Sequence, residues 1–189
     1  MKNLLILFAF VFYLPILNSH TLEKAISSND RETKNILRDS YRNPYETLSF
    51  FEIKSDMKIV ELSPGSGWYT EILANYIDKP GLLIAAHFDK DTNIPYFKRG
   101  RAAFEKKIST NPMYKNVEIV DLSSELAKEG SIDAVLTFRN LHNWLGPQMD
   151  NIFSNAYRAL KSGGIFGVVE HRANPGTSME KMKKSGYVT

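Results

Sequence analysis

Two patterns of hydrophobic residues alternate along the chain from about residue 58 onwards. Short apolar runs, each bounded by glycine, proline or polar residues, have the composition of strands that are buried on both faces. These runs cover residues 58–62, 82–86, 117–120, 131–138 and 165–170. Between them, apolar residues recur three or four positions apart, as on the buried face of a helix. The alternation of strand and helix predicts an α/β fold with a parallel sheet.

The helices of this pattern are amphipathic. They are predicted over residues 68–77, 94–108 and 147–160. Basic residues of the second helix, including Arg101 and Lys107, are placed on a solvated face away from its apolar residues. For residues 55–189 we therefore expect a Rossmann-like, open and mainly parallel sheet with helices on both faces.

Residues 20–54 are predicted to form an N-terminal helical segment. Thr21 to Asp39 has the pattern of a polar helix with widely spaced apolar contacts. A second helix is expected from Pro44 to Phe51, with the side chain of Asn43 as its N-cap and proline in its first turn.

Residues 1–19 have the pattern of a signal peptide. A single lysine precedes an apolar run over residues 4–17, which is short for a bilayer span, and polar residues follow it. Cleavage after Ser19 would give an exported, periplasmic protein. The alternative is an uncleaved segment that anchors the protein to the membrane at its N-terminus.

Composition narrows the classes of function. The formal net charge of +3 is small and is not concentrated in one run, so we expect no nucleic-acid partner. The chain has no cysteine, which excludes disulfides, thiolate metal sites and cysteine nucleophiles. The composition does not determine the oligomeric state.

The segment from Glu61 to Leu73 is predicted to organise the fold. A strand ends near Glu61, a turn of small residues contains Gly65 and Gly67, and a helix begins at Trp68. This order can bring backbone amides close to a nucleotide or nucleoside at a helix N-terminus. The alternative is a plain strand-to-helix turn.

A second candidate segment, residues 139–144, follows the fourth predicted strand. Ligands of open α/β sheets bind beyond the carboxyl ends of the strands, so these side chains should overhang a pocket. His142 is suited to proton transfer, Arg139 to holding a carboxylate or phosphate, and Trp144 to walling an acceptor pocket. Purely structural roles remain the alternative. Glu170 and His171 end the fifth strand nearby, but no metal-ligand spacing is present.

The sequence resembles the class I S-adenosylmethionine-dependent methyltransferases over residues 43–172. Glu61, Gly65 and Gly67 match their first motif, with Ser63 where the first glycine usually stands. Three longer matches resemble a family of exported, methyltransferase-like bacterial proteins. They are residues 61–71 (ELSPGSGWYTE), 137–144 (TFRNLHNW) and 168–173 (VVEHRA).

The resemblance implies S-adenosylmethionine as cofactor. The cofactor-binding residues would be Glu61, Ser63, Gly65, Gly67, Trp68, Tyr69, His87, Asp89, Asp121 and Asn140. His87 stands where the family has an acidic residue for the ribose, so either Asp89 or His87 takes that role. Asp121 would bind the adenine amino group, or would cap the following turn. Tyr41 or Arg42 would cover the pocket, or would lie in a solvated connector.

The predicted activity is methyl transfer to a small-molecule acceptor. His142 would be the general base, and Arg139 or Trp144 would hold the acceptor. The alternative is a non-catalytic protein of the same fold that binds a nucleoside or another small ligand. An NAD-linked oxidoreductase is disfavoured, because Tyr69 and Thr70 stand where the dinucleotide fingerprint needs a later glycine.

The resemblance also implies a further helix that begins near Lys184 and continues past residue 189. An antiparallel pair of strands would follow it. On this view the chain is a truncated product or a fragment. The fifth strand would then be an uncovered apolar edge that favours aggregation or dimerisation, which size-exclusion chromatography can detect.

Overall fold

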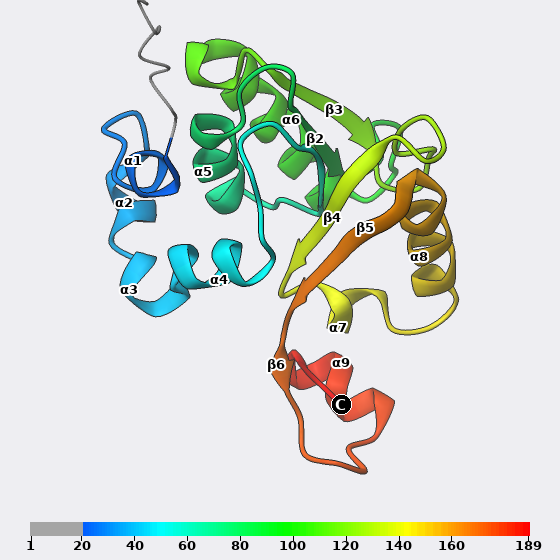
Figure 1. The fold of residues 1–189 in the computed structure, drawn as a ribbon. Coiled ribbons are helices and arrows are strands. Elements are labelled where there is room, and N and C mark those ends of the chain that lie inside the picture. The colour runs from blue at the N-terminus through cyan, green and yellow to red at the C-terminus, as the bar shows by residue number, and fades with distance from the viewer. Residues whose placement is uncertain (1–20) are drawn as a thin grey trace, which may run out of the picture.

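The computed structural model describes residues 21–189 (Figure 1). The signal peptide predicted over residues 1–19 lies outside the described residues. Within the described part, no helix has the length and apolar character that a bilayer span requires.

The helices and strands follow one another in the predicted alternation. The N-terminal segment contains α1 (Leu22–Ile26), α2 (Thr33–Ile36), α3 (Asp39–Arg42) and α4 (Pro44–Phe50). The first half of the sheet region contains β1 (Lys58–Leu62), α5 (Trp68–Tyr76), β2 (Leu82–His87), α6 (Pro95–Thr110), the 3-10 helix η1 (Pro112–Tyr114) and β3 (Val117–Asp121). The second half contains β4 (Ile132–Phe138), α7 (Leu141–Trp144), α8 (Pro147–Ala159), β5 (Leu160–Val169), β6 (His171–Arg172), α9 (Met179–Ser185) and β7 (Tyr187–Val188).

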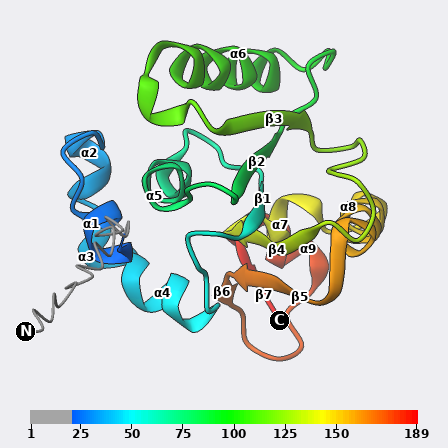
Figure 2. The same cartoon turned by 45° about the horizontal axis from the view of Figure 1, so that its top comes forward.

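Five strands form one parallel sheet in the order β3-β2-β1-β4-β5. The order reverses at β1, where β2 pairs on one side and β4 on the other. Figure 2 shows α5 and α8 on opposite sides of this sheet. The Rossmann-like fold predicted from the sequence is confirmed, with β1 and β4 side by side at its switch point.

Alternate residues of β1 build two cores. Ile59 faces a cluster with α1, α4 and α5, whereas Val60 and Leu62 face a cluster with α7 and α8. All three side chains are fully buried. A strand covered on both faces is apolar at most of its positions, which is why the strands show as nearly continuous apolar runs; Glu61 is the buried exception in β1.

The predicted helix from Thr21 to Asp39 is wrong. The structure has short helices α1 and α2 there, separated by a turn at residues 27–32. The hydroxyl of Ser27 donates to the Glu23 carbonyl, and the hydroxyl of Ser28 accepts from the Asp30 amide. These local hydrogen bonds offer the backbone an alternative to the helical ladder.

Asn43 does not cap α4 with its side chain, as the sequence analysis expected. Its backbone is left-handed (φ 45°) and no side-chain cap is formed. Instead its amide donates to the Asp39 carbonyl and ends α3. Asparagine tolerates this conformation at the C-terminal end of a helix better than most residues do.

The C-terminal part lies beside the sheet rather than in it. β5 is the edge strand, as predicted, and it begins at Leu160, five residues before the predicted start. β6 and β7 form a separate parallel pair, and all strand pairs of residues 21–189 are parallel. Helix α9 begins at Met179, earlier than the helix expected near Lys184.

Candidate functional site

The turn after β1 has a left-handed backbone at alternate residues. Ser63, Gly65 and Gly67 have φ angles of 51°, 61° and 85°. The Ser63 amide donates to the Ala86 carbonyl of β2, and the Gly67 amide donates to the Pro64 carbonyl. A Cβ on Gly67 would lie 3.2 Å from the Phe104 ring, whereas a Cβ on Gly65 would meet nothing within 4 Å. The turn is therefore packed at Gly67 and open at Gly65.

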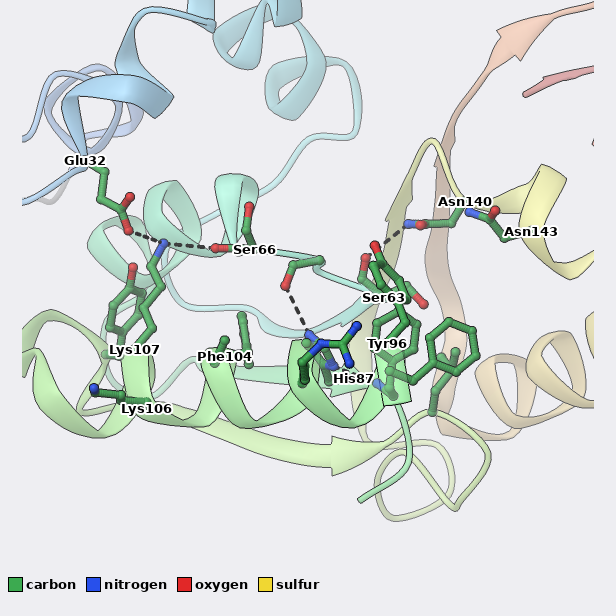
Figure 3. A pocket seen from close by; sticks show the side chains of 18 of the residues that line it. Glu32, Ser63, Ser66, His87, Tyr96, Phe104, Lys106, Lys107, Asn140 and Asn143 are labelled. Atoms are coloured by element: carbon green, nitrogen blue, oxygen red, sulfur yellow. Dashed lines mark hydrogen bonds and ion pairs between the residues drawn. The ribbon is translucent and has the colours of Figure 1, made fainter. Parts of the chain in front are cut away.

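A cavity of about 1280 Å³ extends over this turn (Figure 3). At one end it is lined by residues that follow the strands: Ser63, Gly65, His87, Phe88, Leu122 and Asn140. Its other walls come from α6, from the turn before α2, and from residues 143–148. The cavity thus lies at the carboxyl ends of the strands and at the topological switch point, where open α/β sheets bind ligands.

Asn140 holds the end of β4 against the end of β1. Its Nδ2 lies 3.2 Å from the Ser63 carbonyl oxygen and 3.4 Å from that of Leu62 (Figure 3). It lies 3.2 Å from the hydroxyl oxygen of Thr137 as well. Asn140 therefore fixes the carbonyl side of the glycine turn and also lines the cavity, and its role in cofactor binding stays a prediction.

His87 is neutral and supports the turn through a hydrogen bond, so it is not free to accept one from a ligand. Its Nδ1 accepts from the Phe88 amide at 2.8 Å, so the ring proton is on Nε2, which donates to the Gly65 carbonyl at 3.1 Å. Burial lowers the pKa of the ring, against the effect of the Gly65 hydrogen bond. The prediction that a ring nitrogen accepts from a ribose hydroxyl is wrong, because both nitrogens are engaged.

Glu61 lies beneath the turn and is 2% exposed. Its Oε2 accepts from the Thr70 hydroxyl at 2.6 Å. Burial raises the pKa of the Glu61 carboxyl to about 7, with the Thr70 hydrogen bond and the charge of Lys107 acting in the opposite direction. Glu61 does not line the cavity, so its influence on a ligand would be through the turn and through its charge.

Glu61→Gln should change the pH dependence of stability. The folded-state pKa is raised, so the carboxyl stabilises the fold below its unfolded pKa, and this contribution is lost as the pH rises through about 7. Glutamine keeps the acceptor for Thr70 and does not titrate. Between pH 5 and pH 8, wild type should lose roughly 2 kcal/mol more of its free energy of unfolding than the variant does. Urea unfolding at both pH values measures this difference, and parallel pH profiles would contradict it.

Ser63 is strained at the first glycine position of the motif. Its left-handed backbone is unfavourable for any residue with a Cβ, and its hydroxyl is buried without a hydrogen-bond partner. Ser63→Gly should therefore stabilise the fold by about 1 kcal/mol, even after the larger unfolded-state entropy of glycine is counted. Ser66→Gly in the same turn adds that entropy alone and should destabilise slightly. Thermal midpoints of both variants measure the effect, and equal shifts would refute the strain at Ser63.

The two aspartates at the strand ends are held by other groups. Asp89 Oδ1 accepts from the Ser123 amide at 3.1 Å. Asp89 lines a small cavity of about 260 Å³, which shares Phe88, Phe97, Leu122 and Gln148 with the large one. Asp121 Oδ1 accepts from Arg101 at 2.7 Å. Arg101 is 6% exposed, so the prediction that it lies on a solvated face is wrong. Neither aspartate lines the large cavity.

Trp68 and Tyr69 point away from the cavity, which corrects their prediction as cofactor contacts. Trp68 Nε1 donates to the Asn35 carbonyl at 2.8 Å. Tyr69 stacks on Phe138 with ring centroids 3.5 Å apart. Both side chains belong to the core cluster shared with α1, α4 and α5. Burial raises the pKa of the Tyr69 hydroxyl, so it stays protonated.

His142 and Arg139 also lie outside the cavity lining. His142 Nδ1 lies 3.2 Å from Glu170 Oε2, which also accepts from the Leu141 amide at 3.0 Å. The other side of the ring faces Gly186, where an added Cβ would lie 3.7 Å from Nε2. A carboxylate on Nδ1 is the arrangement that orients a histidine base. His171 stacks on Tyr187 instead of joining this pair.

The cavity wall formed by α6 was not predicted from the sequence. Phe97, Gly100, Phe104 and Lys107 line the cavity along one face of the helix, at i, i+3, i+7 and i+10. The sequence pattern assigned Phe97 and Phe104 to the apolar side of the helix and Lys107 to its solvated face. Lys107 is also not solvated: it donates to Glu71, to Glu32 and to the Ser66 carbonyl, and so holds α6 against the turn and the N-terminal segment (Figure 3).

Comparisons with known proteins identify the fold and the domain family. No curated protein sequence matches the chain. A protein from Aquifex aeolicus described as a SAM-dependent methyltransferase has a similar structure (TM-score 0.59, 17% identity), over 84% of this chain and 77% of that one. A glycopeptide N-methyltransferase solved with S-adenosylmethionine is also similar (TM-score 0.52, 16% identity), over 71% and 52%.

A SAM-dependent methyltransferase from Methanosarcina mazei gives a TM-score of 0.51 at 17% identity, over 67% of this chain and 58% of that one. The chain thus spans little more than half of these last two proteins. At such identities the similarity establishes the fold. The sequence itself matches a methyltransferase domain family over residues 60–168, from β1 to β5. The chain therefore belongs to the methyltransferase domain family.

Proposed function

We propose that the protein is an S-adenosylmethionine-dependent methyltransferase that acts on a small molecule. The observation that carries this proposal is the open side of the glycine turn. Gly65 borders the cavity, and a Cβ added to Gly65 would have no atom within 4 Å. The hydroxyl of the neighbouring Ser63 is buried and has no hydrogen-bond partner. A nucleoside-like ligand could approach the backbone there and satisfy that hydroxyl.

The residues at this end of the cavity fit the chemistry of the cofactor. Phe88 and Leu122 offer apolar surface for a base, while Ser63 and Asn140 offer polar groups. When bound, S-adenosylmethionine supplies an electrophilic methyl group. The contribution of the chain would be alignment of donor and acceptor, which needs no obligatory proton transfer when the acceptor is already nucleophilic.

His142 is the proposed general base for acceptors that must lose a proton. Its contact with Glu170 would hold the orientation of the imidazole ring. The position of His142 outside the cavity lining favours a second candidate function. In this alternative the protein is non-catalytic and binds a nucleoside or another small ligand.

Isothermal titration with S-adenosylmethionine and S-adenosylhomocysteine tests the cofactor site. We expect saturable one-to-one binding of both, and no binding below about 1 mM would refute the methyltransferase proposal. Incubation of the protein with methyl-labelled S-adenosylmethionine and a bacterial small-molecule extract separates the two functions. Labelled product that is lost in His142→Ala supports catalysis, whereas binding without product supports the second candidate.

We also propose that the protein is exported, as its N-terminal pattern and its resemblance to an exported family suggest. N-terminal sequencing of the protein recovered from the periplasm should then begin at His20. Recovery of the intact N-terminus in membranes would support the anchored alternative. S-adenosylmethionine is made in the cytosol, so an exported enzyme would also require a supply of the cofactor outside it.

A further inference from the structure

Arginines from two distant segments meet beside the first turn of α5. Arg42 ends α3, and its guanidinium lies 4.8 Å from the centroid of the Trp68 ring. Arg139 follows β4 directly. Arg38 and Arg139 are both close enough to Arg42 to help lower its pKa, after the larger effect of burial. Tyr69, the neighbour of Trp68, stacks on Phe138, the residue before Arg139, so the chain at Arg139 and the guanidinium of Arg42 lie on either side of the same turn of helix.

Arg38 is exposed and Arg42 and Arg139 are half-buried, and all three lack the carboxylate partners that the buried arginines Arg31 and Arg101 have. Arg31 pairs with Asp39 and Glu71, and Arg101 pairs with Glu105 and Asp121. Within residues 21–189, no carboxylate lies within 4.0 Å of the guanidinium groups of Arg38, Arg42 and Arg139. The Nε of Arg42 is moreover buried and has no hydrogen-bond partner. A buried, unpaired cationic donor is unfavourable, and an anion would relieve it.

Hydrogen bonds fix the Trp68 ring beneath Arg42 and the backbone of Arg139. Trp68, which supports Arg42, is fixed by its hydrogen bond to the Asn35 carbonyl. Arg139 has a left-handed backbone (φ 62°), and its amide donates to the Val169 carbonyl at 2.7 Å. A strained backbone that the surrounding structure enforces is typical of ligand-binding positions.

This cluster is next to the cavity but distinct from it. Trp68 and Tyr69 are the first residues of α5, directly after the glycine turn whose Ser63 and Gly65 line the cavity. Tyr69 stacks on Phe138, the residue before Arg139. An acceptor held by the arginines would therefore lie beside the turn at which we propose that the cofactor binds.

We propose that Arg42 and Arg139 bind an anionic group, a carboxylate or a phosphate, of the methyl acceptor. This assignment rests on the proposed methyltransferase function. Arginine suits the role because its planar fork of donors matches both anions. The carboxylate of the cofactor has the same chemistry, so the experiment has to distinguish these two sources.

Titration with inorganic phosphate at constant ionic strength tests the site, with tryptophan fluorescence as readout because Trp68 lies under Arg42. We expect saturable binding that Arg42→Gln and Arg139→Gln each weaken by about tenfold. Lys98→Gln removes one charge from an exposed position on α6 and should leave the affinity unchanged. Arg42→Lys, which keeps the charge, should restore part of the affinity, and circular dichroism confirms that each variant is folded.

Phosphate binding that is absent, or equal in all variants, would overturn the proposal. A second titration at saturating S-adenosylhomocysteine identifies the source of the anion. Unchanged phosphate affinity supports an acceptor site, whereas competition would assign the arginines to the cofactor carboxylate and overturn the acceptor assignment. If phosphate binds but S-adenosylhomocysteine does not, the acceptor assignment falls with the proposed function, while the anion site itself remains.

Discussion

Gly65→Leu should weaken the binding of S-adenosylhomocysteine by about 100-fold, or about 2.7 kcal/mol. Gly65 lines the cavity, and a Cβ at this position meets no atom within 4 Å, so the leucine side chain would extend into the space proposed for the ligand. The turn cannot easily move away, because the Gly65 carbonyl accepts from the buried His87 ring. Isothermal titration of wild type and variant measures the loss.

Gly130→Leu is a matched control for the backbone. Gly130 has a φ of 65°, against 61° for Gly65, and a Cβ on it also meets nothing within 4 Å. Both variants should therefore lose about 1–2 kcal/mol of stability to the left-handed conformation. Gly130 is not among the residues that line the cavity, so Gly130→Leu should keep wild-type affinity. Wild-type affinity in Gly65→Leu would place the ligand elsewhere.

The fold could be predicted because each central strand is buried on both faces. β1 and β2 begin and end within one residue of the predicted runs at residues 58–62 and 82–86. The sharp turn between β1 and α5 could also be predicted, since glycine permits the positive φ angles of a tight turn and proline fixes φ near its turn value. The Thr21–Asp39 helix failed because its serines and Asn29-Asp30 favour turns, and polar periodicity carries little information without a buried face.

The direction of side chains at the site could not be predicted in the same way. The position of Trp68 directly after the glycine turn is compatible with contact to a ligand or to the core. Its environment is decided by Asn35 and Arg42, which come from the N-terminal helices. No local pattern shows where those short helices pack, so the core role of Trp68 depends on long-range contacts.

Charged pairs between distant segments could not be predicted from the sequence either. Asp121 was a reasonable ligand contact from its place at the end of β3, yet Arg101, twenty residues earlier, occupies one of its oxygens. His142 was placed correctly after β4, but its partner Glu170 turns it toward the C-terminal segment instead of the cavity. The sequence could thus name the edge of the sheet where polar residues gather, but not which of them are already paired.

Glu71→Gln should cost about 3–5 kcal/mol, a large share of the stability of an ordinary domain. The Glu71 side chain is fully buried and accepts from Lys107 and from Asn35, both at 2.7 Å. Its other oxygen lies 3.8 Å from Nε of Arg31, whose side chain is also fully buried. Loss of this one charge leaves the buried Arg31 with Asp39 as its one remaining counter-ion and Lys107 with Glu32. The amide also turns a donor toward groups that can only donate.

Glu105→Gln is the matched control, because Glu105 pairs with an arginine as well but its side chain is 39% exposed. Solvent screens that pair, so its loss should cost no more than about 1 kcal/mol. Urea unfolding followed by tryptophan fluorescence compares the two variants. Glu71 joins α5 to α6 through Lys107 and to the N-terminal segment through Arg31 and Asn35. Equal midpoints for both variants would mean that apolar contacts alone hold that segment on the sheet, and the ion network would then have no part in closing the cavity wall.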